Sequence, residues 1–215
     1  MPVLARSTLP NAITVARMAL APVVFFLVFV PSFGARFVAW IFFLIAAFSD
    51  LWDGYLARKH GWISNFGMLV DPIADKLLLV STFIPFYVLS NRAAPEGQLP
   101  LIGALPLWVV LVVLGREFLV TVLRSLVARR GIVIPAGRAG KLKAVFQNIF
   151  SGATILWFAL QTAAYRGDWA GTAWDTWQVF HGFVVVATLV IAVTLTISSM
   201  IVYLWDWRRL VRAAM

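Results

Sequence analysis

The sequence predicts an all-α membrane protein, and three observations support that fold class. Of the 215 residues, 62% are hydrophobic and only 13% are charged, whereas a soluble domain has about 45–50% and about 25%. Apolar runs of about 20 residues recur along the chain, which is the length that a helix needs to cross a bilayer. The ~10-residue alternating segments of a transmembrane barrel do not occur in the sequence. We therefore expect a polytopic bundle of membrane-spanning helices.

The apolar runs predict six transmembrane helices within one domain, residues 1–215. The expected spans are 11–32, 37–59, 70–90, 103–129, 142–164 and 176–205. Turn-forming residues fall in the connections, at 31–34, 95–97 and 131–140. The stretch 1–10 lacks a clean cleavage site, so we expect a short interfacial segment there rather than a signal peptide.

The net charge of +9 indicates how the bundle is oriented. If the N-terminus is cytoplasmic, 12 of the 18 Lys and Arg residues fall on the cytoplasmic side, as the positive-inside rule requires. The outer connections then carry only Arg36, Arg92 and Arg166. Basic residues placed in this way suit an anionic leaflet, so we expect no nucleic-acid partner. The sequence contains no Cys, which excludes disulfides, thiolate metal ligands and a cysteine nucleophile.

Acidic residues are concentrated where a passive helical bundle would not carry them. Of the nine Asp and Glu residues, those within or at the ends of predicted spans are Asp50, Asp53, Asp71, Asp75 and Glu117. A lone charge at the bilayer centre costs about 2.5–3.5 kcal/mol on insertion scales, so an intramembrane carboxylate is by default a functional hypothesis. A proton relay in an ion-coupled transporter and purely structural ion pairing are the competing interpretations.

The spacing of four carboxylates predicts that they converge. At 100° per residue, Asp50 and Asp53 are about 60° apart on one helix, and Asp71 and Asp75 are about 40° apart on the next. A linker of about ten residues makes the two helices antiparallel neighbours, with all four carboxylates near the cytoplasmic interface. Mg²⁺ takes oxygen ligands from carboxylates and substrate phosphates, so two such ions could clamp a pyrophosphate.

Small and basic residues extend this acidic pattern into a longer motif. The full string is Asp50-x2-Asp53-Gly54-x2-Ala57-Arg58-x8-Gly67-x3-Asp71-x3-Asp75. It resembles the signature of the CDP-alcohol phosphotransferase family at all eight fixed positions. The resemblance implies a six-helix membrane bundle, usually a homodimer, with an active site open to the cytoplasm. It also implies transfer of a phosphatidyl or substituted phosphoryl group from a CDP-linked donor to an alcohol, with two Mg²⁺ or Mn²⁺ ions and release of CMP.

The resemblance also implies a role for each motif position. The residues that resemble the metal ligands are Asp50, Asp53, Asp71 and Asp75. Asp75 further resembles the residue proposed to deprotonate the acceptor hydroxyl. The residues that resemble the nucleotide and pyrophosphate contacts are Gly54, Ala57, Arg58 and Gly67. Asn11, Thr14 and Arg17 either cap and anchor the first helix or line the nucleotide site.

Four further stretches bear on the acceptor alcohol. Residues 9–17, 71–76, 115–124 and 140–143 are similar to bacterial phosphatidylglycerophosphate synthases of this family. That similarity implies CDP-diacylglycerol as donor, entering sideways from the lipid of the inner leaflet, and glycerol 3-phosphate as acceptor, in a bacterial inner membrane. The alternative acceptors are phosphatidylglycerol, which would give cardiolipin, inositol phosphate and serine.

A glycerol 3-phosphate acceptor is an anion and needs a basic pocket. The candidates for binding its phosphate are Arg116, Arg124, Lys141, Lys143 and Arg138. Lys141 and Lys143 are about 200° apart on an ideal helix, so both cannot point into one pocket if the helix already includes them. For Arg116 and Arg124, the competing interpretation is structural pairing with Glu117, or snorkelling of the side chain to the membrane interface.

Overall fold

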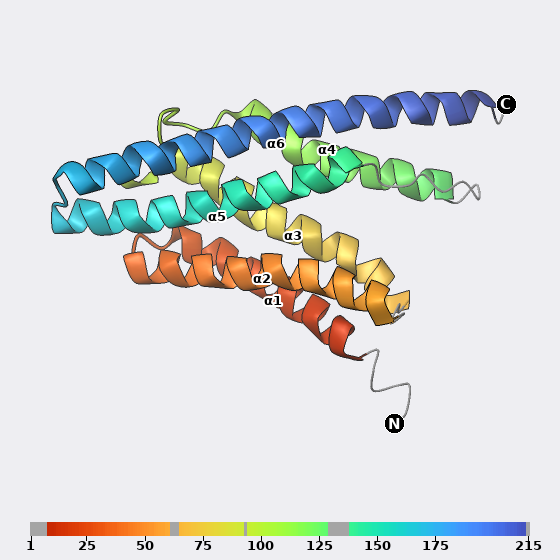
Figure 1. Ribbon diagram of the computed structural model, residues 1–215, viewed down its shortest axis with the longest axis horizontal. Coiled ribbons are helices and arrows are strands. Elements are labelled where there is room, and N and C mark those ends of the chain that lie inside the picture. The colour runs from red at the N-terminus through yellow and green to blue at the C-terminus, as the bar shows by residue number, and fades with distance from the viewer. Residues whose placement is uncertain (1–7, 61–64, 93, 129–137, 214–215) are drawn as a thin grey trace.

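A computed structural model describes residues 8–60, 65–92, 94–128 and 138–213 of the chain. Within these ranges it contains six α-helices and no named strand (Figure 1). The helices are α1 (Thr8–Phe29), α2 (Phe33–His60), α3 (Asn65–Ser90), α4 (Leu107–Ala128), α5 (Arg138–Gly167) and α6 (Thr172–Ala213). A single 3-10 turn, η2 (Pro95–Gly97), lies between α3 and α4. The all-α prediction is therefore confirmed for the described residues.

The helices begin and end at slightly different residues from those that we predicted. The first helix ends at Phe29 rather than at 32, and the second starts at Phe33 rather than at 37, so the connection between them lies a few residues earlier than predicted. The fourth helix starts at Leu107 rather than at 103, because Leu99 and Gly103 pair in a turn that places Leu101 and Gly103 at positive φ. The fifth and sixth helices are longer than the predicted spans, since α5 begins at Arg138 and α6 covers 42 residues.

Each helix packs mainly against two others. The main packing order is α1, α2, α5, α6, α4, α3 and back to α1. Helices α2 and α3 run in opposite directions (Figure 1), as the short connection between them predicts, and α1 packs against both. Helices α4 and α5 are not adjacent in this order, because α6 lies between them.

The core of the bundle is aromatic. Phe83 and Phe86 of α3 contact Phe150 of α5, with ring centroids 5.4 and 5.8 Å apart, and all three side chains are fully buried. Phe86 also contacts Phe158 at 5.7 Å. Large aromatic rings in edge-to-face and tilted contacts stabilise a core by roughly 0.5–1.5 kcal/mol per pair beyond their burial. These aromatic contacts join α3 and α5 in the core of the bundle.

Arg36 ties three elements together at one end of the bundle. Its side chain is only 2% exposed, although the sequence alone suggested a charge in an outer loop. The guanidinium donates to the carbonyl oxygens of Val28 (3.2 Å), Glu96 (3.4 Å) and Phe158 (3.2 Å). It also donates to the Thr162 hydroxyl. The arginine therefore joins the end of α1, η2 and α5.

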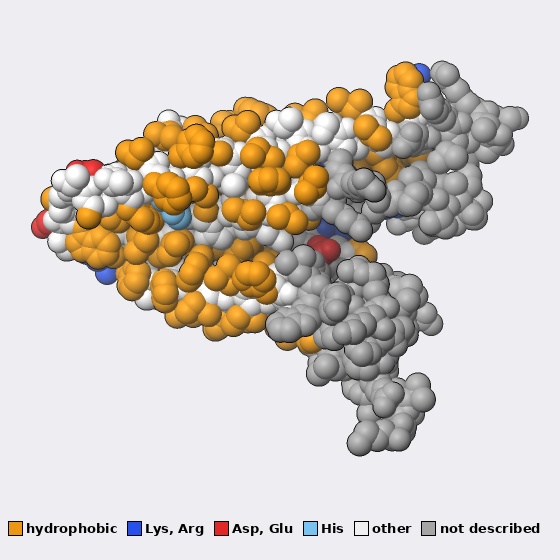
Figure 2. All heavy atoms as spheres, in the orientation of Figure 1, with side chains coloured by type: hydrophobic (Ala, Val, Ile, Leu, Met, Phe, Trp, Pro, Cys, Tyr) orange, Lys and Arg blue, Asp and Glu red, His pale blue; other side chains and the backbone are white. Residues whose placement is uncertain are grey.

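Two helical segments in the described residues are long and apolar enough to cross a membrane, Pro72–Ser90 and Thr172–Trp205. The segments Ile13–Phe29 and Phe33–Ser49 are apolar but shorter. Large hydrophobic side chains cover much of the outer surface (Figure 2), which is typical of helices that face lipid. The chain is thus all-helical in its described part, and its two long apolar segments support the expected membrane protein, while six complete spans remain a prediction.

Candidate active site

The predicted acidic motif is divided between two consecutive helices. Its first half, residues 50–58, falls on the C-terminal part of α2, and its second half, residues 67–75, falls on the N-terminal part of α3. The motif side chains that lie outside the described part of the structure are those of Asp50, Asp53, Ala57, Arg58 and Asp71. Gly54 of α2 and Gly67 of α3 lie in the same stretches, where the helix is described but the surroundings of its residues are not.

Asp75 is the motif carboxylate whose surroundings are described. Its side chain is 54% exposed, and its Oδ1 accepts a hydrogen bond from the Arg17 guanidinium at 3.0 Å. Arg17 comes from α1 and is 1% exposed. Because a charge-assisted hydrogen bond to a guanidinium is directional, Arg17 fixes how the Asp75 carboxylate is turned.

The position of α1 explains how Arg17 reaches the acidic motif. This helix packs against both α2 and α3, so one of its faces looks toward the motif. Thr14 lies one turn before Arg17 and is also buried, at 2% exposed. The side chain of Asn11 lies outside the described part of the chain. The sequence pattern placed Asn11, Thr14 and Arg17 near one another but did not identify Asp75 as the partner of Arg17.

The donor set of the motif fits hard divalent cations. Four carboxylates on two consecutive helices supply only oxygen ligands, which Mg²⁺ and Mn²⁺ prefer. Asp75 is half exposed, so its carboxylate is accessible from outside the bundle. The residues with described side chains contain no group of three potential metal ligands, because three of the four motif carboxylates lie outside them.

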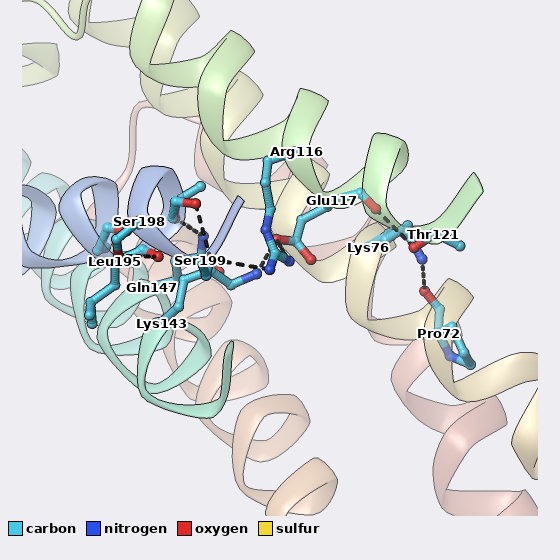
Figure 3. Close-up of polar contacts among 12 residues, drawn as sticks. Pro72, Lys76, Arg116, Glu117, Thr121, Lys143, Gln147, Leu195, Ser198 and Ser199 are labelled. Carbon is cyan, nitrogen blue, oxygen red and sulfur yellow. Dashed lines mark hydrogen bonds and ion pairs between the residues drawn. The ribbon is translucent and has the colours of Figure 1, made fainter. Parts of the chain in front are cut away.

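A second polar cluster gathers side chains from three other helices. Arg116 donates from α4 to the carboxylate of its neighbour Glu117 at 3.1 Å and to the Ser199 hydroxyl of α6 at 3.2 Å. Lys143 of α5 donates to the same Glu117 oxygen. Figure 3 shows Arg116 and Glu117 directed from α4 toward Lys143. We call Arg116, Glu117, Lys143 and Ser199 the basic cluster.

Two more cations lie at the edge of the basic cluster. Lys76, the residue after Asp75, donates to the Pro72 carbonyl at 2.8 Å (Figure 3). It interacts electrostatically with Glu117, Asp75 and Arg124. The exposed Arg124 guanidinium lies over the Tyr203 ring, 5.8 Å from its centroid. Lys76 therefore connects the acidic motif with the basic cluster, and we had not predicted it as a site residue, although its position next to Asp75 was the available signal.

The structure distinguishes among the predicted phosphate-binding residues. It brings Arg116 and Lys143 together around Glu117, and it places Arg124 within electrostatic range of Lys143. The helix includes both lysines of the pair 141 and 143, since α5 begins at Arg138. The Lys143 side chain points at Glu117. The side chains of Lys141 and Arg138 lie outside the described residues.

Charged side chains are rare on the described surface, and several of them meet at one place. Figure 2 shows acidic and basic side chains together in a recess of a surface that is otherwise mostly hydrophobic. Among the residues with described side chains in and around the basic cluster, the cations Lys76, Arg116, Arg124 and Lys143 outnumber the carboxylates of Glu117 and Asp75. A partly buried excess of positive charge favours the binding of a multiply charged anion.

The chain belongs to the CDP-alcohol phosphatidyltransferase family. The family model matches residues 7–205, which include the acidic motif, Arg17 and the whole basic cluster. The family resemblance of the motif is therefore confirmed over nearly the full length of the chain, and with it the assignment as a phosphatidyltransferase enzyme.

Curated relatives refine this assignment. A probable phosphatidylglycerophosphate synthase of Mycobacterium tuberculosis is 40% identical over 153 residues, which are 70% of this chain and 66% of that protein. The CDP-diacylglycerol–glycerol-3-phosphate 3-phosphatidyltransferase of Bacillus subtilis is 38% identical over 160 residues, 69% of this chain and 76% of that protein. A cardiolipin synthase (CMP-forming) of Streptomyces coelicolor is 32% identical over 178 residues, 79% of this chain and 76% of that protein.

Proposed function

We propose that this protein transfers a phosphatidyl group from CDP-diacylglycerol to glycerol 3-phosphate, giving phosphatidylglycerophosphate and CMP. The family and the names of the relatives from Mycobacterium tuberculosis and Bacillus subtilis support this reaction. The observation that carries the choice of acceptor is the excess of cations around Glu117, which lies close to Lys76 and, through it, to Asp75. A phosphorylated alcohol, such as glycerol 3-phosphate or inositol phosphate, has the charge that such a site needs, whereas serine does not.

The donor side of the proposed site is the acidic motif. The residues proposed to hold two divalent cations, Mg²⁺ or Mn²⁺, are Asp50, Asp53, Asp71 and Asp75. When bound, these ions would neutralise the charge of the donor pyrophosphate. The residues proposed to contact the nucleotide and pyrophosphate are Gly54, Ala57, Arg58, Gly67, Asn11 and Thr14. Thr14 is only 2% exposed and lies one turn from Arg17, so its hydroxyl lies inside the bundle near Arg17, which is compatible with such a role.

The chain's own residues supply the proton transfer in the proposed mechanism. The Asp75 carboxylate, turned by Arg17, accepts the proton of the acceptor hydroxyl. The resulting oxygen forms a bond to the phosphorus that carries the diacylglycerol, and the bond from that phosphorus to the CMP oxygen breaks. CMP leaves with the electron pair of that bond. Positioning of the acceptor and electrostatic stabilisation supply most of the rate enhancement in phosphoryl transfer.

The acceptor side of the proposed site is the basic cluster with its edge. The residues proposed to bind the phosphate of glycerol 3-phosphate are Arg116, Arg124 and Lys143, joined by Lys76. Arginine presents a planar fork of donors that matches phosphate oxygens, and lysine adds a point charge. Lys141 and Arg138 remain sequence-based candidates for the same role.

Phosphatidylglycerol is the second candidate acceptor, because one relative is a cardiolipin synthase. The similarity to the Streptomyces coelicolor cardiolipin synthase covers 79% of this chain. Phosphatidylglycerol is also an anion, and its headgroup carries a free hydroxyl. Cardiolipin formation from CDP-diacylglycerol is therefore the second candidate function.

One assay separates the two candidates. The full-length protein in detergent–lipid micelles is given CDP-diacylglycerol and Mg²⁺ with radiolabelled glycerol 3-phosphate, phosphatidylglycerol, inositol phosphate or serine. We expect labelled phosphatidylglycerophosphate and an equimolar amount of CMP with glycerol 3-phosphate. CMP release with phosphatidylglycerol alone would replace the proposed acceptor, and no CMP release with any acceptor would refute the proposed reaction.

We also propose that the enzyme works as a homodimer in the inner membrane, with the acidic motif facing the cytoplasm. The distribution of basic residues supports this orientation, because positive charge favours the cytoplasmic side. The apolar segments of α3 and α6 support insertion into the bilayer.

A further inference from the structure

One carboxylate in the basic cluster, that of Glu117, forms ion pairs with two nearly buried cations. The side chains of Arg116 and Lys143 are 9% and 4% exposed, and that of Glu117 is 19% exposed. Both cations donate to the same atom, Oε1 of Glu117. The guanidinium of Arg116 and the ammonium group of Lys143 are therefore both held next to one carboxylate oxygen.

This meeting point bridges helices that do not otherwise pack closely. Glu117 and Arg116 belong to α4, and Lys143 belongs to α5, whereas α6 lies between these two helices in the packing order. Arg116 and Lys143 carry like charges and repel each other. Close approach of the two cations across this gap thus depends on the anion between them.

The two cations retain donors that Glu117 does not use. The Nε atom of Arg116 is buried and has no hydrogen-bond partner among the described residues. The ammonium group of Lys143 has three protons, and in the described part of the chain Glu117 is its one hydrogen-bond acceptor. Unused donors on two buried cations indicate that the cluster is built to bind a further anion.

We propose that Glu117 is a positioning residue, which gathers Arg116 and Lys143 to one point so that their remaining donors bind the phosphate of the acceptor together. This inference rests on the proposed function, because it assigns the acceptor phosphate to the basic cluster. Glu117 does not touch the reacting hydroxyl in this scheme. Its loss should therefore weaken acceptor binding and leave donor binding and the chemical step largely intact.

The first test compares Michaelis constants of the full-length protein and its Glu117→Gln variant in micelles with CDP-diacylglycerol and Mg²⁺. We expect the KM for glycerol 3-phosphate to rise about tenfold, with the KM for CDP-diacylglycerol and kcat each changed by less than about threefold. Glu96→Gln is the matched control, because it removes one carboxylate at η2, away from the cluster, and should leave all three constants unchanged. A lower KM for glycerol 3-phosphate would overturn the proposal, since Glu117 would then compete with the acceptor.

The second test asks whether Glu117 acts through Lys143. In a double-mutant cycle with Lys143→Gln, the double variant should have nearly the same KM for glycerol 3-phosphate as Lys143→Gln alone. Independent, multiplying effects would overturn the proposal, as would an equal rise in both Michaelis constants. If Glu117→Gln does not fold, Glu117→Asp keeps the charge on a shorter side chain, and its smaller rise in the acceptor KM gives the same comparison.

Binding of inorganic phosphate separates this inference from the proposed function. Calorimetric titration of phosphate into wild type and Glu117→Gln needs no turnover, and we expect about tenfold weaker binding in the variant. Equal phosphate affinity in both proteins would refute the positioning role. A wild-type protein that binds phosphate but does not use glycerol 3-phosphate would instead refute the proposed function.

Discussion

Replacing Arg36 by alanine should destabilise the fold and leave the chemistry unchanged. The guanidinium is 2% exposed and donates to three backbone carbonyls, those of Val28, Glu96 and Phe158. Alanine removes these donors and leaves buried carbonyl oxygens without them. None of the contacts of Arg36 described above involves Asp75 or the basic cluster. The geometry of these two sites should therefore persist as long as the bundle remains folded.

The size of the effect follows from the number of bonds. A hydrogen bond to a charged group contributes about 1.5–3 kcal/mol net, but the three bonds share one guanidinium whose burial is itself costly. Alanine also removes that burial cost, so we take about 3–5 kcal/mol, the equivalent of about two such bonds, for Arg36→Ala. For a chain of this size, 1 kcal/mol shifts Tm by about 2–4 °C, so the expected decrease in Tm is roughly 6–20 °C.

The assay is thermal unfolding in detergent, combined with CMP release measured well below the transition. Arg36→Lys keeps the charge but not the planar fork, so we expect an intermediate Tm. Arg92→Ala is the matched control, because this exposed arginine only lies over the Phe29 ring, 5.6 Å from its centroid. A Tm for Arg36→Ala within 2 °C (about 1 kcal/mol or less) of wild type would refute the view that Arg36 holds the three elements together.

Three further predictions concern the proposed active site. Asp75→Asn should abolish CMP release while nearly preserving Tm, because the amide cannot accept the hydroxyl proton; a variant with full turnover would exclude Asp75 as the base. Arg124→Ala should raise the KM for glycerol 3-phosphate more than that for CDP-diacylglycerol, and equal increases would argue against an acceptor role for Arg124. Chelation by EDTA should stop CMP release, and Mg²⁺ or Mn²⁺ should restore it, because four carboxylates without cations repel the donor pyrophosphate. Undiminished turnover in EDTA would contradict the metal assignment.

Local spacing was enough to predict the helices and the order of the functional residues along them. Apolar runs of bilayer length predicted six helices, and the observed ends differ by at most five residues, except that α6 ends at Ala213, eight residues beyond the predicted 205. The intervals between Asp50 and Asp75 depend only on the helical period, so the acidic motif could be recognised without a structure. A family is defined by such local intervals, which is why the comparison with known proteins agrees with the motif.

Partners across helices depended on the tertiary structure. The sequence put Arg36 in an outer loop and left Arg116 with two interpretations, because a helix that is apolar on most sides does not reveal which face turns inward. Only the packing order shows that Arg17 of α1 reaches Asp75, and that Glu117 receives Lys143 from a helix that is not its packing neighbour. The chain by itself thus determined which chemical groups are available and in what order. The rotation and crossing of the helices decided which of those groups meet, because contacts between residues far apart in sequence depend on the orientation of whole helices rather than on local spacing.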